Sequence, residues 1–288
     1  GMALNFLGDD PRLAPGIQLA GRSVLRIGVA LLGLRLTFEH VAALGAGTVA
    51  ALAVAVAATV ASGVLLARVL KVAPSFGVLA GGATAICGAS AALALASVLP
   101  RREGLERDTT LTIVVVTTLS TVAMIVYPVF SARMGFDATT AGLFVGATIH
   151  DVAQVVGAGY AIGQQAGDAA TITKLMRVAM LVPLLLVVAL WLRQPAERGV
   201  RSAPLLPWFA VAFSLLVVLN SVVDLPPVLR TGATTASQAC LVVAIAAVGL
   251  KTSLREVAQV GWRPAAVIVG ATLWLALLAA VYLHFSRG

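Results

Sequence analysis

Long stretches without a charged residue divide this chain and leave few folds open to it. Runs without Asp, Glu, Lys or Arg recur along the chain, among them 72–100, 109–132, 203–223, 231–250 and 264–283. Each can cross a hydrocarbon core about 30 Å thick, which takes about 20 helical residues. Charged residues make up 11% of the chain, against about 25% in soluble domains. We therefore predict an all-α polytopic membrane protein surrounded by a lipid bilayer.

The apolar segments predict nine crossings, and the connections between them are too short to hold a soluble domain. The predicted crossings are 15–35, 41–67, 76–99, 109–132, 139–163, 172–192, 205–223, 231–250 and 264–284. Residues 1–288 are thus expected to form a single transmembrane domain. The opening GMALNFLGDDP resembles the end of a helix running into a loop, which predicts an incomplete N-terminus.

The basic residues indicate a topology rather than a nucleic-acid partner. The net charge is +8, but the Lys and Arg residues are scattered singly among the connections, as topology signals are. Under nine crossings, 12 of the 20 fall on the side that holds the start of the chain and 8 on the other. The positive-inside rule then weakly favours a cytoplasmic start.

Two 13-residue segments resemble one another. Residues 33–45 read GLRLTFEHVAALG and residues 249–261 read GLKTSLREVAQVG, with five identities in an ungapped alignment. Each follows a small-residue apolar helix and precedes another crossing, and nine crossings would give the two copies opposite directions. Inverted repeats are typical of secondary transporters, so we predict repeat elements near 27–70 and 243–286. Chance similarity of two short loops is the alternative.

An ionisable pair, His150 and Asp151, lies in the middle of the fifth predicted crossing. Such groups are costly inside a membrane and mark substrate, ion or proton pathways. Asp151 could take up a proton or a sodium ion, and His150 could relay a proton near neutral pH. In a continuous helix, His150 and Gln154 would share a face with Gly146, Ala153, Gly157 and Ala161. The alternative is a polar network that ties helices together.

The segment 81–97, GGATAICGASAALALAS, predicts a broken helix. Three glycines within eight residues cost about 1 kcal/mol each relative to alanine in a helix. A second half beginning near Gly88, Ala89 and Ser90 would present free N–H groups and a positive helix end to an anion. Thr84 and Cys87 lie beside this break. Close helix packing through small residues is the alternative.

Lys174 and Arg177 stand at the start of the sixth predicted crossing, three residues apart and so on one face. They are either interfacial anchors that snorkel or, for Arg177, a partner of Asp151 or of an anion. The two cysteines, Cys87 and Cys240, show neither metal-ligand spacing nor a disulfide framework. Phosphate-binding and hydrolase motifs are absent from the sequence, so we expect neither an enzyme nor a cofactor.

Several motifs together carry a family resemblance. GLRLTF, ICGASA, GATIHDVAQVVGAG, KLMRVAMLVP, PWF and GLKTSL are similar to segments of the YeiH-type proteins, a bacterial inner-membrane family named for a suggested role in sulfate export. The resemblance covers the whole chain. It implies an inner-membrane location, an inverted-repeat bundle with broken helices related to sodium–proton antiporters and bile-acid-type carriers, and further crossings ahead of residue 1.

These observations predict a secondary transporter for a small anion such as sulfate, sulfite, a sulfonate or a carboxylate. The substrate would contact Thr84, Cys87, Gly88, Ala89, Ser90, His150, Gln154 and Arg177. Asp151, with or without His150, would bind the coupling proton or sodium ion. A cation–proton antiporter and a non-transporting sensor or assembly component are the alternatives. The sequence leaves open whether the protein forms a homodimer.

Overall fold

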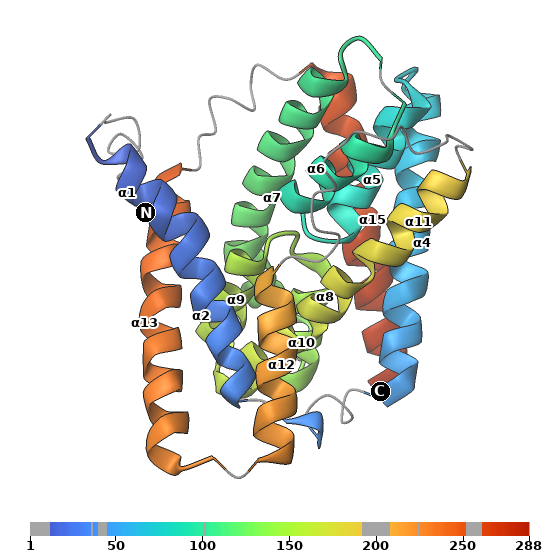
Figure 1. Cartoon of the computed structure of the whole chain (residues 1–288). Helices are drawn as coiled ribbons and strands as arrows, with labels where there is room; N and C mark the ends of the chain where they lie inside the picture. The colour runs from blue at the N-terminus through green and yellow to red at the C-terminus, as the bar shows by residue number, and fades with distance from the viewer. Residues whose placement is uncertain are drawn as a thin grey trace.

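The computed structural model describes residues 12–35, 37–39, 45–100, 102–191, 208–223, 225–251 and 261–287, and the regular structure within these ranges is helical. Within these ranges, four spans are long and apolar enough to cross a membrane. They are α4 (Gly45–Val69), α7 (Leu105–Arg133), the pair α10 (Gln164–Ala179) and α11 (Leu181–Trp191), and α15 (Trp262–Arg287). These spans surround the centre of the molecule (Figure 1).

A second group of helices packs beside these spans, on the left and in the lower middle of Figure 1. It contains α1 (Ala14–Leu19), the π-helical turn Ala20–Val24, α2 (Leu25–Leu31), the 3-10 turn Leu32–Arg35, α12 (Trp208–Val222) and α13 (Pro227–Lys251). Ser237 on α13 donates a hydrogen bond to the Gly28 carbonyl on α2 (2.6 Å). Gly33 lies so close to the α12 backbone at Phe213 that a side chain would not fit.

The first of two helical hairpins follows α4. It consists of α5 (Pro74–Ala85), three residues of turn and α6 (Ala89–Val98). Gly82 on α5 lies in direct contact with Leu95 on α6. Thirteen residues of continuous helix would separate these two positions by about 20 Å, so the chain reverses at the turn. Figure 1 shows both arms in the upper half of the molecule.

The second hairpin enters from the opposite side and consists of α8 (Ala138–Thr148) and α9 (Val152–Ile162). Gly146 on α8 and Gly159 on α9 both lie against Ala170 of α10, which again requires the chain to fold back. In Figure 1 this hairpin occupies the lower half of the molecule. Its tip lies level with Ser120, near the middle of α7, because the Asp151 amide donates to the Ser120 hydroxyl (3.0 Å).

The two hairpins correct the prediction of nine crossings. Residues 76–99 and 139–163 each enter the molecule and leave it on the same side, so neither is a crossing. The helix break predicted near Gly88 is confirmed, but the chain turns back there instead of continuing through the membrane. The sixth predicted crossing begins at Gln164 and not at 172. Most of the two similar segments, at 36, 40–44 and 252–260, lies outside the described residues.

Glycines bring the first hairpin close to its neighbouring span. A Cβ on Gly63 of α4 would lie 2.6 Å from the Gly77 carbonyl oxygen and 2.8 Å from the Gly81 Cα atom. Both neighbours are backbone atoms of α5 and cannot move aside as a side chain would. Contact between small residues is the usual way for helices to approach closely within a membrane. These glycines therefore hold α5 directly against α4.

Candidate functional site

The tips of the two hairpins meet in the middle of the molecule, and α10 supplies the cations that join them. The Lys174 Nζ atom donates to the Ile86 carbonyl at the tip of the first hairpin (2.5 Å) and to the Ile149 carbonyl at the tip of the second (2.9 Å). The side chain is completely buried. One ammonium group thus bridges two segments that are 63 residues apart in the sequence.

Arg177 binds the same two tips, one helical turn further along α10. Its Nε donates to the Ala85 carbonyl (2.8 Å), and its Nη2 donates to the carbonyls of Ala85 (2.6 Å) and Thr84 (2.9 Å). Its Nη1 donates to the carbonyls of Gly146 and Ile149, both at 3.1 Å. A guanidinium has five N–H groups, so in this arrangement Arg177 has none left for a substrate.

Helix electrostatics explain why cations bind at this point. The last carbonyls of a helix lack partners within the helix, and the end of the helix carries about half a negative charge. α5 and α8 both end at the centre of the molecule, where water cannot satisfy these carbonyls. Breaking a buried pair by removing one partner leaves the other uncompensated and is strongly destabilising. We therefore expect the cations and the carbonyl ends to depend on each other.

His150 links the tips of the two hairpins to α15. Its Nδ1 lies 3.0 Å from the Thr84 carbonyl oxygen, and its Nε2 lies 3.0 Å from the Thr272 hydroxyl. A carbonyl oxygen only accepts, so Nδ1 carries the proton, and a neutral ring then accepts from Thr272 at Nε2. Thr272 also lies 2.9 Å from the Ile268 carbonyl, so its hydroxyl has two acceptors within reach. His150 is completely buried.

Asp151 begins α9 and caps it. Its carboxylate accepts from the Ala153 amide (3.0 Å), and the side chain is half-buried. No Lys or Arg nitrogen lies within 4 Å of it in the described part of the chain. Gln154 is buried one turn later, where its amide nitrogen reaches the Thr121 hydroxyl (3.4 Å). Its Oε1 has no donor among the described residues.

The first turn of α6 is the most open part of the centre. Gly88 precedes the helix with a φ of 60°, a conformation that favours glycine. Gly88 has no side chain with which to cap the helix, and the Ala91 amide in the first turn is hydrogen-bonded to the Cys87 sulfur. Cys87 is buried, Ala89 is half-buried and Ser90 is exposed. The buried Thr84 and Thr112 hydroxyls lack hydrogen-bond partners among the described residues, which is unusual for buried polar groups.

The structure brings most of the predicted site residues together but changes the position of some. Thr84, Cys87 and Gly88 lie beside His150, as a Cβ on Gly88 would be 3.7 Å from the His150 Cβ. The common helical face proposed for Gly146 through Ala161 is wrong, because the helix ends at Thr148 and restarts at Val152. The interpretation of Lys174 and Arg177 as interfacial anchors is also wrong, because both are buried in mid-span.

The central position of Lys174 was not predicted from the sequence. The signal was present in the preceding residues, where QQAGDAATIT supplies nearly three helical turns of mostly small side chains. Counting the helix from Gln164 places Lys174 and Arg177 near the middle of a 28-residue span. A basic residue at that depth is costly unless it is paired, which would have indicated a structural or functional role.

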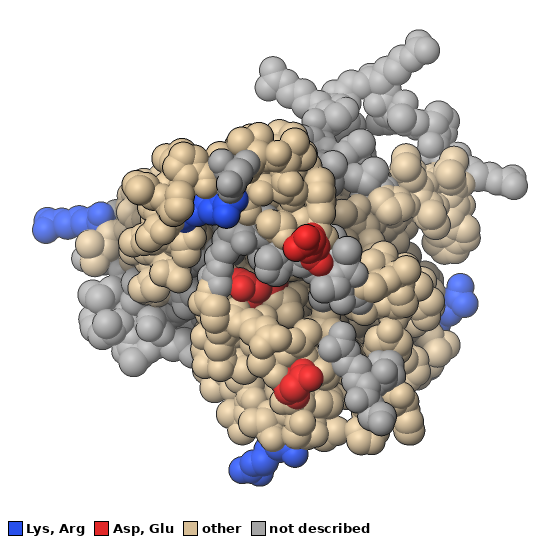
Figure 2. All heavy atoms as spheres, turned by 90° about the horizontal axis from the view of Figure 1, so that it is seen from below, with Lys and Arg blue, Asp and Glu red and all other residues tan. Residues whose placement is uncertain are grey.

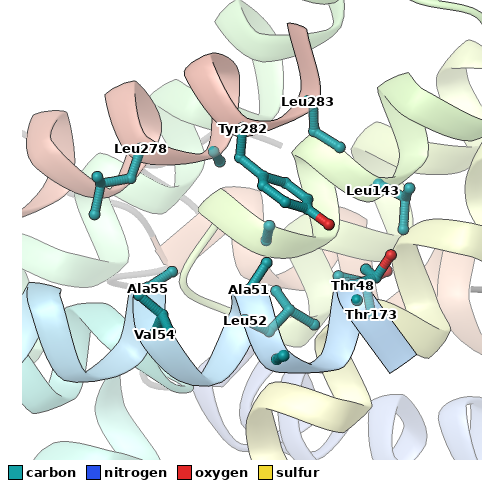
Figure 3. A pocket seen from close by; sticks show the side chains of 14 residues that line it. Thr48, Ala51, Leu52, Val54, Ala55, Leu143, Thr173, Leu278, Tyr282 and Leu283 are labelled. Carbon is teal, nitrogen blue, oxygen red and sulfur yellow. The ribbon is translucent and has the colours of Figure 1, made fainter. Parts of the chain in front are cut away.

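A cavity of about 360 Å³ lies apart from the polar centre, between α4 and α15 (Figure 3). Its walls also include Leu143 and Ala147 of α8 and Thr173 of α10. None of its lining residues is charged, and none of the predicted site residues lines it. The cavity is therefore distinct from the centre at which the hairpins meet.

The described fold and centre define a helical membrane protein in which two opposed hairpins meet at buried charges. The sequence model of one family, described as conserved hypothetical protein 698, matches residues 1–268. The chain belongs to this family, whose curated relatives are called UPF0324 membrane proteins.

The curated relatives extend over nearly all of the chain. UPF0324 membrane protein TauZ of Paracoccus denitrificans is 46% identical and covers 99% of this chain, which spans 85% of that relative. A UPF0324 membrane protein of Chlorobaculum tepidum is also 46% identical over 96% of this chain and 78% of its own length. One from Rhizobium meliloti is 46% identical over 98% of this chain and 83% of its own length. No solved structure matches the chain.

Proposed function

We propose that this protein is a secondary transporter that moves a small anion across the bacterial inner membrane, coupled to a proton or a sodium ion. The observation that carries the proposal is the meeting of two opposed hairpin tips at a buried centre containing Lys174, Arg177 and Asp151. Transporters place binding sites where interrupted helices end near the bilayer midplane. A purely structural bundle could run both helices through the centre without a break and would then need no buried charges, which are costly.

The charge balance favours an anion near the start of α6. Lys174 and Arg177 face the negative ends of α5 and α8, and Asp151 offsets the positive end of α9. At the positive end of α6 the Cys87 sulfur accepts from the Ala91 amide, but the N-cap residue is Gly88 and supplies no carboxylate. Backbone N–H groups at a helix start bind anions readily, and the unpartnered Thr84 and Thr112 hydroxyls could donate as well.

The proposed substrate contacts are Thr84, Cys87, Gly88, Ala89 and Ser90, together with His150 and Gln154. Arg177 contributes positive potential through its fixed position, since its N–H groups are donated to carbonyls. Sulfate, sulfite, sulfonates and carboxylates share the compact oxygen-rich head that such a site accommodates. The hairpin tips provide hydroxyls and backbone amides for these oxygens, and the exposed Ser90 marks the accessible edge.

Asp151 and Gln154 supply the features expected of a coupling site. They lie three residues apart at the start of α9, so their side chains are neighbours on one face. The Gln154 Oε1 atom needs a donor or a cation. A proton on Asp151 would supply the donor, and a sodium ion held between the two side chains would serve as the cation. The same pair supports the alternative of a cation–proton antiporter without an anion.

The arrangement of the spans supports an inverted repeat of 27–70 and 243–286. In Figure 1, α2 runs downward and is followed by an upward α4, whereas α13 runs upward and is followed by a downward α15. The helices flanking the two similar segments thus run in opposite directions, as an inverted repeat requires.

The two hairpins change which connections lie on each side of the membrane, and so change the count of basic residues on each side. The count of basic residues by side leaves out Arg22 and Arg26, which lie inside the first helical segment, and the central Lys174 and Arg177. Of the remaining basic residues that the structure describes, seven lie at or next to helix ends on the upper side of the molecule as drawn in Figure 1, and four lie at those on the lower side. Figure 2 shows the lower face, where acidic side chains lie near the middle and basic ones at the rim. The positive-inside rule then favours a cytoplasmic upper side, which holds the start of the chain.

Transport by purified protein in liposomes tests the proposal. Wild-type protein should move at least one of sulfate, sulfite, a sulfonate or a carboxylate in response to a proton or sodium gradient. Asp151→Asn should lose this gradient dependence. Asp137→Asn is a matched control, because Asp137 caps the start of α8 at the outer end of the same hairpin and asparagine caps equally well.

The outcomes separate the candidate functions. Gradient-driven anion uptake that persists in Asp151→Asn would show that Asp151 is not the coupling residue. Exchange of sodium for protons without movement of any anion would identify the antiporter. A wild-type protein that moves no solute of either class would favour the non-transporting component.

A further inference from the structure

The apolar cavity between α4 and α15 has no role in the proposed transport, because none of the proposed substrate or coupling residues lines it. It extends along the first turns of α4, from Gly47 to Ala55, and along the last turns of α15 near Leu278 and Tyr282. Figure 3 shows Ala51 and Ala55 on α4 opposite Tyr282 and Leu278 on α15. Both helices are membrane spans, so the cavity lies at the depth of the hydrocarbon core.

The lining of the cavity disfavours both ordered water and an empty cavity. Its polar side chains are those of Thr48, Thr173 and Tyr282, and the Thr173 hydroxyl is already bound to the Ala169 carbonyl. Water in a cavity needs two to four polar partners. An empty cavity would cost its walls their dispersion contacts. At about 360 Å³ it reaches the size range of ligand pockets.

We infer that the cavity binds one acyl chain of a membrane lipid, inserted from the leaflet on the lower side of Figure 1. The mouth is open to the bilayer, as Val54 at its edge is 67% exposed. From Gly47 to Ala55 the wall rises by about 12 Å, close to the depth of about 15 Å of one leaflet. Hydrocarbon chains are the medium at this depth, and the apolar lining matches them.

The bound chain supports the second hairpin. Leu143 and Ala147 of α8 form the inner wall of the cavity, and Ala147 stands three residues before His150. The acyl chain therefore fills the space between α4 and α15 on one side and α8 on the other, and α8 is the hairpin arm that leads to His150 at the centre. Tyr282 lies near the lower end of α15, where an aromatic residue with a hydroxyl suits the membrane interface. This role is independent of the substrate that the protein transports.

A photoreactive lipid tests the inference on the full chain. Wild-type protein in nanodiscs would contain phosphatidylethanolamine with a diazirine near the end of one acyl chain, and labelled peptides would be mapped by mass spectrometry. We expect the label on the cavity walls, within 47–55 and 278–283. Ala51→Phe should lower labelling of these segments at least fivefold by filling the cavity.

Ala53→Phe is the matched control. Ala53 is on the same helix but exposed and absent from the cavity wall, so this variant should label like the wild type. If Ala51→Phe does not fold, Ala55→Leu fills the cavity more gently and should lower labelling at least twofold. Labelling of the cavity walls no stronger than that of the exposed α7 residues Val122, Ile125 and Val126, or unchanged in a folded filling variant, would overturn the inference. Neither result depends on transport activity.

Discussion

Replacing Arg177 with methionine is the most direct test of how the two hairpins are held together. The substitution retains a long unbranched side chain and removes all five hydrogen bonds to the hairpin carbonyls. The Thr84 carbonyl would keep His150, and the Ile149 carbonyl would keep Lys174. The Ala85 and Gly146 carbonyls would lose the side-chain donors that reach them in the described part of the chain.

The expected loss of stability follows from these two carbonyls. A buried acceptor left without its partner costs about 1–3 kcal/mol, so two of them cost about 2–6 kcal/mol. At about 2–4 °C per kcal/mol for a chain of this size, the melting temperature of Arg177→Met should fall by about 4–24 °C. Thermal unfolding in detergent, followed by a thiol-reactive dye that reports exposure of Cys87 and Cys240, measures this change. Cys87 is buried in the folded protein, which gives the dye a low starting signal.

Arg133→Met is the control, because Arg133 is exposed at the end of α7. A surface substitution changes stability by about 0.5 kcal/mol or less, so its melting temperature should stay within about 2 °C of wild type. An Arg177→Met protein that melts as the control does would refute the argument that the cation holds the tips. Lys174→Met should also destabilise, and the double variant should show non-additive losses because both cations bind the Ile149 carbonyl.

Two further predictions address the packing and the His150 contact. Gly63→Ala should destabilise by about 1–3 kcal/mol because its Cβ would meet the α5 backbone. Gly47→Ala, whose Cβ meets nothing closer than 3.8 Å, should melt at or above the wild-type temperature. Thr272→Val should lower the melting temperature by about 2–12 °C by leaving His150 Nε2 without a donor, while Thr272→Ser should restore it. Equal melting of the valine and serine variants would show that the hydroxyl contributes nothing.

The first hairpin shows how far local sequence signals reach. Three glycines and the position of Gly88 predicted a break that the structure contains within one residue. They did not predict that the chain turns back, because a glycine permits either a continuing or a reversing path. The reversal depends on Gly82, which lets Leu95 approach from thirteen residues away. A contact between residues thirteen positions apart cannot be predicted from the local order of residue types.

The second hairpin was missed for the opposite reason. Apart from His150 and Asp151, the segment from 138 to 163 is mostly apolar, and it contains no proline, so its pattern favours a continuous helix. The break depends on Asp151, whose carboxylate caps α9, and on Ser120 of α7, which accepts from the Asp151 amide. Asp is a preferred residue at a helix start. The HD pair thus carried a structural signal as well as a functional one, and only the functional one was recognised.

The Lys174 and Arg177 pair explains why both breaks can exist inside a membrane. Ending two helices at the midplane leaves carbonyls that neither lipid nor water satisfies. A single helix carrying cations at i and i+3 presents both to one side, and the two hairpin ends converge on that side. The bound tips leave the start of α6 as the exposed positive end. The cations are thus used to hold the hairpin tips, and the start of α6 beside Ser90, where no carboxylate caps the helix, is the place at which we propose that the anion binds.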